Sequence, residues 1–510
     1  MLFACSTGIQ EIEFKKASDC TLAVSGGKLY LYGKIFFLYE DDGLTPVDYS
    51  EERLAAIIDK HKEDASLFIE GSFFIMLDVD GRQVFFSDFF GRYRAYCTFS
   101  AGVLFISESV DELVEINPEV NPFEEQVYAK KGYTGRHFTT YEKIYRVIGG
   151  QYFTVTPQGI TVSLVFEPGR VGLGAGTYPE FEKIVDSTFP YFFSKDKRNV
   201  IEFSGGVDSS FLALYAKIKG YDIELVTGRL RNPSLDQNKY DVARSLQKSF
   251  DLNVPLGCID VDLANLGDTT EARHAVVKSM MPFEKHFGKL HIKLVTALEG
   301  RQDEIIAING QNADSIVCLG PSEKINLSLS LRGVLSGGKG LLSRLLLSKY
   351  YCAVVGKRSG TSVTAIHQFF IKDGVRLPLN RESYLLVNMF FSKGYLPVLT
   401  GKVAIEPEFT DYLYRNYCEP YKGFGVGEVL YISKLQNFMH GGDHRIVLCS
   451  HAVSGVDVAL PFTTIALFRF FAGCDRSVDY VLRGKGFLED FLKKNMRNFE
   501  KTVAPRDLKI

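Results

Sequence analysis

The sequence contains no tryptophan and no apolar run long enough to cross a membrane. Its nine cysteines are scattered singly without a CxxC pair, and its histidines do not cluster at the spacing of metal ligands. These absences argue against a membrane span, a disulfide framework and a structural zinc site. The N-terminus shows no basic stretch followed by an apolar one, so no signal peptide is expected. By elimination, we expect a cytoplasmic protein with reduced thiols.

The charge balance points away from nucleic acid as the main partner. The chain has 59 Lys and Arg against 61 Asp and Glu, with no basic tail or stripe. Apolar residues make up 46 % and charged residues 24 %, which is typical of a globular protein. A length of 510 residues exceeds what one core usually holds, so two domains are expected.

The first part of the chain, residues 1–166, has mostly the pattern of short strands. Turn signals separate apolar stretches, and a helical pattern over 51–62 interrupts them. We therefore expect stacked sheets with some helix. The expected strands cover 29–37, 67–79, 83–87 and 103–107, with a last pair within 144–157.

A glycine-rich segment, EPGRVGLGAGT, lies within 167–178 and is interpreted as a linker. In 179–510, strands first alternate with helices, which predicts a doubly wound parallel sheet. Helical patterns dominate from about 340 onward. The fold class is thus α/β after an α+β N-terminal domain. The strands of the second domain are expected at 200–203, 223–226, 254–261 and 304–308, with helices over 211–219 and 240–250.

The heptapeptide SGGVDSS is the most informative motif, and it lies between a strand and a helix. A glycine-rich turn at a helix N-terminus presents backbone N–H groups and a partial positive charge to a phosphate. The motif comprises Ser204, Gly205, Gly206, Val207, Asp208, Ser209 and Ser210. This spelling resembles the PP-loop of ATP pyrophosphatases, which split ATP into AMP and pyrophosphate.

Two carboxylates near this loop are candidate metal ligands. Asp208 would repel ATP unless a cation bridges them, and Mg²⁺ accepts carboxylate and phosphate oxygens together. Asp314 follows a predicted strand in the glycine-containing turn NGQNADS, so it should reach the same edge of the sheet. Alternatively, Asp208 only complements the helix dipole and Asp314 belongs to an ordinary Asx turn.

Together these motifs resemble the asparagine synthetase superfamily over nearly the whole chain. The loop at 310–315 resembles the family's G-x-G-x-D-E, and LPFT at 460–463 resembles its P-F-L-D. GSFFIMLD, SDFFG and SES, within 71–109, resemble segments of the family's glutaminase domain, and GY at 132–133 with Ile144 and Gly150 continues the match to the domain's end. The resemblance implies an Ntn-glutaminase-like domain followed by an ATP-binding domain.

The resemblance also implies residue roles. Phe203, Val226 and Gly310 would line the adenosine, residues 204–210 would hold phosphates, and Asp208 and Asp314 would hold Mg²⁺. Lys485, with Lys493 and Lys494 as fallbacks, corresponds to the family's charge-stabilising lysine. With 59 Lys and Arg in the chain, the alternative is that Lys485 is an ordinary surface lysine. Arg445 is a candidate for the substrate pocket.

The N-terminus departs from the family pattern. A working glutaminase needs Cys directly after the initiator Met, because the free α-amine acts as the base for the thiol. This chain begins MLFAC, and Leu2 hinders removal of Met1. The family's R-G-P and N-G-E segments are also absent from 1–70. We therefore expect a glutaminase-inactive scaffold.

Three hypotheses follow. The first is an AMP-forming amide ligase whose substrate carries both carboxylate and amine, as in β-lactam and carbapenam synthetases and lasso peptide cyclases, enzymes of antibiotic biosynthesis. β-lactam-forming members carry a Tyr that takes part in acid–base chemistry at the position of Gln311. An amide does not titrate. Gln311 therefore favours a lasso-type or other amide ligase. The substrate would be a small molecule or peptide, and a precursor-processing enzyme is a possible partner. The second hypothesis is an amidotransferase using free or partner-delivered ammonia on aspartate or a sugar carboxylate. The third is a non-catalytic scaffold.

Overall fold

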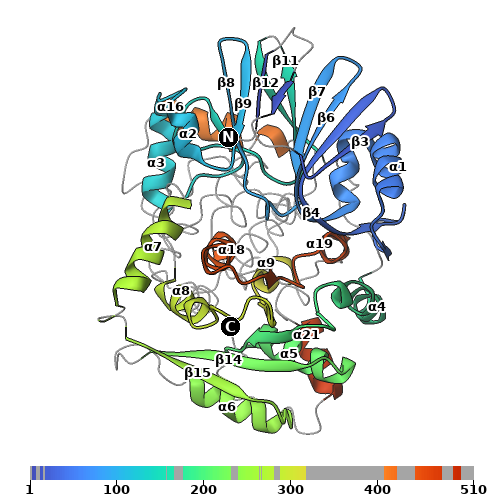
Figure 1. Ribbon diagram of the computed structural model, residues 1–510, viewed down its shortest axis with the longest axis vertical. Coiled ribbons are helices and arrows are strands. Elements are labelled where there is room, and N and C mark those ends of the chain that lie inside the picture. Colours follow the sequence, from blue (N-terminus) through green and yellow to red (C-terminus); the bar gives the residue numbers. More distant parts are fainter. Residues whose placement is uncertain are drawn as a thin grey trace, which may run out of the picture.

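The computed structural model describes residues 3–6, 12–14, 18–131, 133–156, 158–165, 176–230, 239–262, 265, 267–280, 288–317, 407–417, 419–421, 443–473 and 486–495. Two antiparallel sheets form the N-terminal part, and a parallel sheet follows (Figure 1). Within the described ranges, no helix combines the length and apolar character that crossing a bilayer requires.

The N-terminal sheets consist of a five-stranded sheet, order β10-β8-β9-β1-β2, and a seven-stranded sheet, β12-β11-β7-β6-β4-β3 with β5 on β4. Register between β4 and β6 shifts at Ile35/Phe37, where a bulge bends the long strands. The strands are β1 (Phe3–Ser6), β2 (Ile12–Phe14), β3 (Cys20–Val24), β4 (Gly27–Tyr39), β5 (Pro46–Val47), β6 (Ile69–Val79), β7 (Arg82–Ser87), β8 (Tyr96–Ser100), β9 (Val103–Ser107), β10 (Ile144–Arg146), β11 (Gln151–Thr156) and β12 (Gly159–Leu164).

These two sheets stack face to face between helices. Along β4, Tyr32 joins a core with Cys97 and Leu104 of the facing sheet, while Leu31 joins a core with Leu54 of a helix. This alternation is the period-2 pattern of a strand buried on both faces. The helical elements are α1 (Glu51–His61), η1 (Lys62–Leu67), α2 (Val110–Val114) and α3 (Pro122–Lys131). The predicted stacked sheets and the helix over 51–62 are confirmed.

The parallel sheet has the order β15-β14-β13-β16-β17. Its strands are β13 (Arg198–Glu202), β14 (Ile223–Leu230), β15 (Leu256–Val261), β16 (Ile305–Ile308) and β17 (Val458–Ala459). All its pairs are parallel, as the alternating strands and helices predicted. The short β17 was not predicted.

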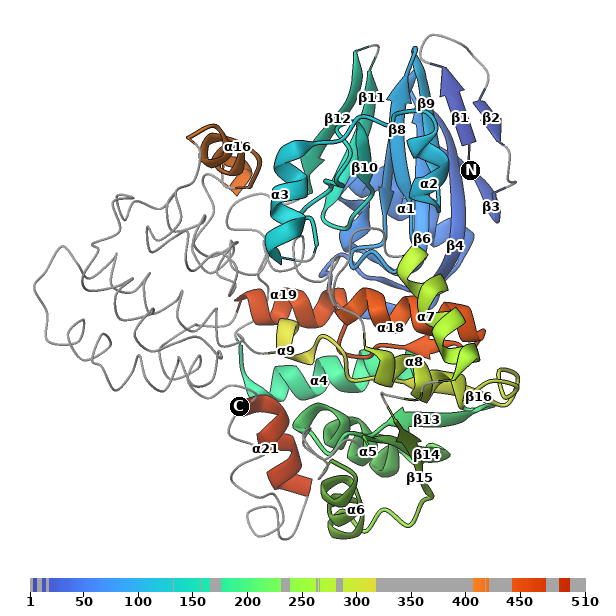
Figure 2. The same ribbon diagram turned by 90° about the vertical axis from the view of Figure 1, so that its left-hand side faces the viewer.

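Helices cover both faces of this sheet (Figure 2). Along β13, Val200 packs with Leu294 of α8, and the next residue, Ile201, packs in the cluster that contains Phe211 of α5. Neighbouring side chains on a strand point to opposite faces, so α5 and α8 lie on opposite sides. The helical elements are α4 (Tyr178–Thr188), η2 (Phe189–Tyr191), α5 (Val207–Lys219), α6 (Lys239–Ser249), α7 (Asp268–Met280), α8 (Lys289–Thr296), α9 (Ala313–Ile316), α16 (Pro407–Tyr417), η4 (Glu419–Tyr421), α18 (Asp443–Ser454), α19 (Ile465–Gly473) and α21 (Gly486–Asn495).

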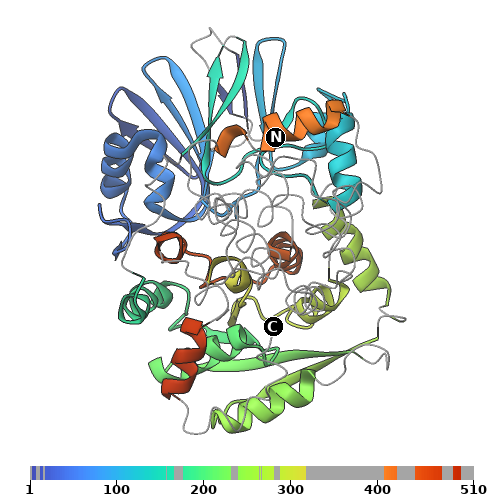
Figure 3. The ribbon, with the colours of Figure 1, turned by 180° about the vertical axis from the view of Figure 1, so that it is seen from behind.

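A shared aromatic core joins the antiparallel and parallel sheets. Phe37 lies edge-on to Phe192, with ring centroids 6.0 Å apart, and Phe89 lies 4.9 Å from Phe468. Figure 3 shows α18 and α19 between the N-terminal sheets and the parallel sheet. The predicted linker falls largely in 166–175, outside the described residues, and α4 begins at Tyr178 after a Thr177–Glu180 capping box. The division at 166 and 178 stays a prediction.

Candidate functional site

The site lies where the strand order of the parallel sheet reverses. The chain runs outward from β13 to β14 and β15, and then returns to β16 on the other side of β13. Ligands of open α/β sheets bind in the crevice at such a reversal, beyond the carboxyl ends of the strands. Here the loops after Glu202 and Ile308 form that crevice.

The first of these loops is SGGVDSS. Gly205 has φ +77°, and a Cβ there would lie 3.0 Å from Val242 Cγ1 and 3.2 Å from the Ala243 nitrogen, so the loop requires glycine. Gly206 is the N-cap of α5 and no side chain caps the helix, and Asp208 and Ser209 in its first turn line the cavity described below. Ser204 Oγ and Ser209 Oγ lie 3.3 Å apart, bracing the turn. This arrangement suits a phosphate.

The second loop begins at Asn309, whose Oδ1 accepts a hydrogen bond of 2.6 Å from the Gln311 nitrogen. Gly310 brings the two loops together, because a Cβ on it would stand 3.1 Å from Asp208 Cβ. Asn312 has φ +72° and is the N-cap of α9. The structure thus brings Asp208 and the second loop close together at the edge of the sheet where the sequence predicted both.

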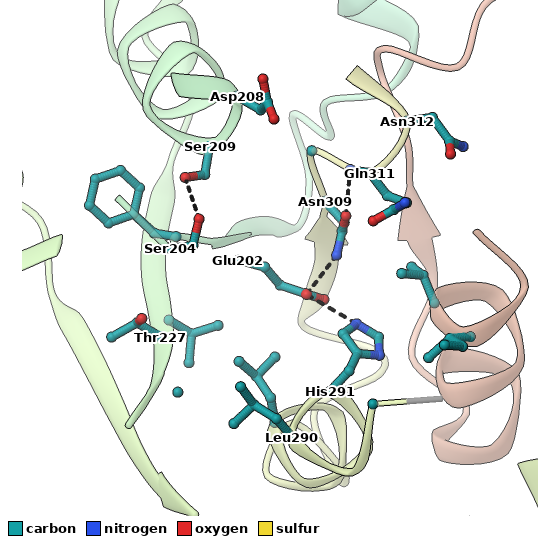
Figure 4. Close-up of a pocket in the computed structure, with 18 of the residues that line it drawn as sticks. Glu202, Ser204, Asp208, Ser209, Thr227, Leu290, His291, Asn309, Gln311 and Asn312 are labelled. Atoms are coloured by element: carbon teal, nitrogen blue, oxygen red, sulfur yellow. Dashed lines mark hydrogen bonds and ion pairs between the residues drawn. The ribbon is translucent and has the colours of Figure 1, made fainter. Parts of the chain in front are cut away.

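A cavity of about 520 Å³ lies between these loops, a volume typical of small-molecule sites. Figure 4 shows Asp208, Ser209 and Ser204 on one side and Asn309, Gln311 and Glu202 on the other. The cavity is lined by Glu202, Phe203, Ser204, Asp208, Ser209, Val226, Thr227, Gly228, Gly288, Leu290, His291, Leu294, Asn309, Gly310, Gln311, Asn312, Ser315, Ile446 and Val447. Seven residues of the predicted site line it: Phe203, Ser204, Asp208, Ser209, Val226, Gly310 and Gln311.

The remaining predicted residues are placed differently. Gly205, Gly206 and Ser210 shape the loop without lining the cavity. Arg445 is buried on α18 and does not line the cavity, although the next two residues do. The Asp314 side chain and all of Lys485 lie outside the described residues.

Neither fallback lysine lines the cavity. Lys493 and Lys494 lie on α21, and Lys494 Nζ is 2.7 Å from Glu182 Oε1 of α4. This ion pair joins α21 to α4, and α21 also packs against α5. The assignment of a charge-stabilising lysine therefore still rests on Lys485.

Sequence reasoning missed a polar group at the base of the cavity, which consists of two half-buried residues and one buried one. Glu202, the last residue of β13, lies within hydrogen-bonding distance of His291 on α8 and His451 on α18. Although burial raises the pKa of the Glu202 carboxyl, the two facing imidazoles outweigh this effect and hold its pKa well below the ordinary value. The chain shows no local histidine cluster, but the fold brings these distant residues together. Spacing along the chain gives no sign of this group, because its three members lie far apart in the sequence.

A second polar contact fixes the loop after β16 to the rest of the protein. Asn312 Nδ2 donates a hydrogen bond of 2.6 Å to His444 Nδ1 and lies 3.3 Å from Thr463 Oγ1. Burial, together with the charges of Arg92 and Arg445, lowers the pKa of His444 to about 3, so the ring is neutral and Nδ1 can accept. The segment resembling P-F-L-D thus positions the second loop.

No protein-family model and no curated protein matches the chain. Among solved structures, a glutamine phosphoribosylpyrophosphate amidotransferase from B. subtilis, complexed with ADP and GMP, is 12 % identical with a TM-score of 0.19; the match covers 62 % of this chain and 61 % of that one. A structure described as the allosteric regulatory enzyme of purine biosynthesis is 11 % identical with a TM-score of 0.20, over 63 % and 61 % of the two chains. The chain thus spans less than two thirds of either protein, and at these TM-scores neither likeness carries an argument about function.

Proposed function

We propose that this protein is an ATP-dependent amide ligase that forms AMP and pyrophosphate. A carboxylate of the substrate would attack the α-phosphorus of ATP and release pyrophosphate. An amine would then attack the acyl carbon of the adenylate and release AMP. The observation that carries the proposal is the approach of Gly310 to Asp208, which unites the SGGVDSS loop and the NGQNADS loop around one cavity.

The described residues fit a nucleotide with its metal. The uncapped start of α5 offers N–H donors to phosphates, and Phe203 and Val226 offer apolar surface for adenosine. Mg²⁺, when bound, neutralises phosphate charge. Asp208 lies in the first turn of α5 beside the cavity, so it is the described carboxylate that would hold Mg²⁺, with Asp314 as the partner implied by the family resemblance.

We further propose that the attacking amine belongs to the substrate itself, as in ring closure. A substrate that carries its own amine needs no ammonia supply, since proximity replaces high concentration. Gln311 lines the cavity and its amide does not titrate, so its role would be to orient the substrate by hydrogen bonds.

The nucleotide products test the reaction type. Purified protein incubated with Mg²⁺, ATP and candidate amino acids or peptides should form AMP and pyrophosphate, separated by chromatography, and should catalyse ATP–pyrophosphate exchange. ADP and phosphate as the products would contradict the proposal. Hydrolysis of glutamine to supply the amine would contradict the intramolecular part alone.

A binding test needs no substrate. Asp208→Asn should weaken Mg·ATP binding at least about 10-fold in calorimetry, since a carboxylate ligand is lost. Asp222→Asn is the matched control. Asp222 precedes β14, at the edge of the sheet opposite the cavity, where its exposed carboxylate pairs with Arg198. An equal loss in both variants would count against a metal role for Asp208.

A further inference from the structure

Glu202, His291 and His451 form a compact ligand group at the base of the cavity. The Nε2 atoms of His451 and His291 lie 2.9 Å from Glu202 Oε1 and 3.1 Å from Oε2, respectively. Candidate ligand atoms of all three residues lie within 4.8 Å of one another. They come from β13, α8 and α18, so the fold, and not a local motif, creates the group.

The hydrogen-bond partners show which nitrogen of His451 is available. His451 Nδ1 lies 3.2 Å from the carbonyl oxygen of Val456, and a carbonyl only accepts, so Nδ1 carries the hydrogen. In a neutral ring, Nε2 then directs a lone pair at a carboxylate oxygen 2.9 Å away. Two lone-pair atoms this close need a proton or a cation between them.

Glu202 is also held in place by a hydrogen bond, whereas the second nitrogen of His291 has no partner among the described residues. Asn309 Nδ2 donates to Glu202 Oε2 at 2.7 Å, which orients the carboxylate. His291 Nδ1 is buried and has no hydrogen-bond partner among the described residues. Histidines that bind metals commonly donate their second nitrogen to a carbonyl, and ligating carboxylates are held by hydrogen bonds. His451 and Glu202 show both features.

We propose that Glu202, His291 and His451 bind one Zn²⁺-class divalent cation. Two imidazoles and one carboxylate suit Zn²⁺, whereas Mg²⁺ prefers oxygen ligands alone. Ligands about 2.0–2.1 Å from a tetrahedral ion stand about 3.3 Å apart. The two nitrogens contact different oxygens of Glu202, and one ligand atom from each residue lies within 4.8 Å of the others, so small side-chain rotations would enclose an ion. This site is distinct from the proposed Mg²⁺ position at Asp208, and it does not depend on the protein being an ATP-dependent ligase.

The fourth coordination position would face the cavity. Glu202 and His291 line the cavity, whereas His451 closes the group from behind, buried on α18. Three protein ligands with one open position is the arrangement of zinc sites that engage a ligand or water. The ion would therefore take a carboxylate or another lone-pair donor of a molecule bound in the cavity.

Metal binding can be measured directly on the full chain. After treatment with chelator, the protein is titrated with Co²⁺, whose visible absorption is strong in tetrahedral sites, and then loaded with Zn²⁺ and desalted. We expect about one retained Zn²⁺ per chain that excess Mg²⁺ does not displace. His451→Gln and His291→Gln should each lose the Co²⁺ spectrum, and Asn309→Ala should weaken Zn²⁺ binding about 10- to 100-fold. His61→Gln, on α1 of the N-terminal sheets, is the control and should behave as wild type.

The nine cysteines could retain zinc elsewhere, so the ligand type must be read as well. X-ray absorption of the Zn²⁺-loaded wild type should show nitrogen and oxygen neighbours, and this measurement needs no variant to fold. A sulfur shell, equal retention in the His291/His451 double variant, or no Co²⁺ spectrum in the wild type would each overturn the proposal. In the last case, the group is an imidazolium–carboxylate cluster held by protons alone.

Discussion

Arg92 Nη1 lies 2.6 Å from Glu70 Oε1, in an ion pair whose side chains are 5 % and 0 % exposed. The other Glu70 oxygen accepts hydrogen bonds from the Ile465 nitrogen at 2.9 Å and from Tyr39 Oη at 3.0 Å. Arg92 also donates to the carbonyl of Thr463. A carboxylate of β6 therefore holds the segment that enters α19, which gives the N-terminal sheets a structural role.

Glu70→Gln should destabilise the protein by about 3 kcal/mol, because it removes the carboxylate that pairs directly with the buried guanidinium of Arg92. The measurement is urea or guanidinium unfolding. Glu119→Gln is the control, since Glu119 and Lys143 form an exposed pair at 3.5 Å, and its loss should be too small to resolve. Equal stability of Glu70→Gln and wild type would mean that the carbonyl groups of Gly71 and Thr463, with the nearby carboxylate of Asp88, satisfy Arg92 without Glu70.

The same substitution should also affect the cavity. Thr463 lies within 3.3 Å of Asn312 Nδ2, and Asn312 begins the short helix of the second loop. Displacement of Thr463 by Glu70→Gln should therefore weaken ATP binding several-fold at temperatures where the variant is still folded. Unchanged affinity would show that the Asn312–His444 contact positions the second loop without help from Thr463.

Gly205→Ala should abolish nucleotide binding and lower stability. The substitution forces a side chain into φ +77° and places its Cβ 3.0 Å from Val242. The conformational part alone is worth about 1 kcal/mol. Calorimetric titration with Mg·ATP and thermal unfolding measure the two effects.

Gly220→Ala is the control that separates the cost of a positive φ from an effect on nucleotide binding. Gly220 ends α5 with φ +75°, and a Cβ there meets nothing within 4 Å. Gly220→Ala should lose about as much conformational stability as the positive φ costs in Gly205→Ala, but it should keep the ATP affinity of the wild type. If both variants bind ATP equally, the loop after β13 is not the phosphate cradle.

Much of this fold could be predicted, because many of its strands and helices follow the local pattern of apolar, polar and glycine residues. The strand over 103–107 was predicted with the bounds that the structure shows, and Gly220 ends α5 with a positive φ. The crevice was predictable too, since alternating strands and helices place the loops after β13 and β16 at one edge. Short elements such as β17 carry too few residues for a pattern.

The ligand group at Glu202 was beyond sequence reasoning for a different reason. Glu202 is the last residue of β13, two positions before Ser204, and could be taken as an ordinary strand residue, while His291 and His451 lie on helices with no motif around them. Their proximity depends on how α8 and α18 pack together, which is a tertiary relationship. A single sequence therefore holds no signal for this group.

Gly310→Ala tests the approach of the two loops. The added Cβ would stand 3.1 Å from Asp208 Cβ, closer than ordinary contacts, so the loops must separate. We expect Mg·ATP affinity to fall about 10-fold or more with little loss of stability, because Gly310 does not have a positive φ. Gly257→Ala on β15 is the control, since its Cβ meets Val226 Cγ2 at 3.5 Å, an ordinary contact. Retained affinity in Gly310→Ala would show that the two loops do not bind one ligand jointly.

Buried His444 should make the protein sensitive to acid. Its pKa is about 3 in the folded state, lowered by burial and by Arg92 and Arg445, against about 6.5 in an unfolded chain. Between these values the unfolded state binds a proton that the folded state does not. The stabilisation is therefore complete above pH 6.5 and is lost as the pH falls toward 3, by up to about 1.4 kcal/mol per pH unit.

Unfolding free energies measured from pH 7 to pH 4 for wild type and His444→Gln check this prediction. Glutamine keeps an acceptor for Asn312 but does not titrate, so the variant should show a shallower decline with acid. His137, buried with its pKa also well below the ordinary value, should supply part of the slope that remains. Asn312→Ala removes the same hydrogen bond while leaving the histidine in place, so it should lower stability at every pH and keep the wild-type slope. A His444→Gln profile parallel to that of wild type would mean that the imidazole is protonated in the folded protein, and Asn312 could then not donate to Nδ1.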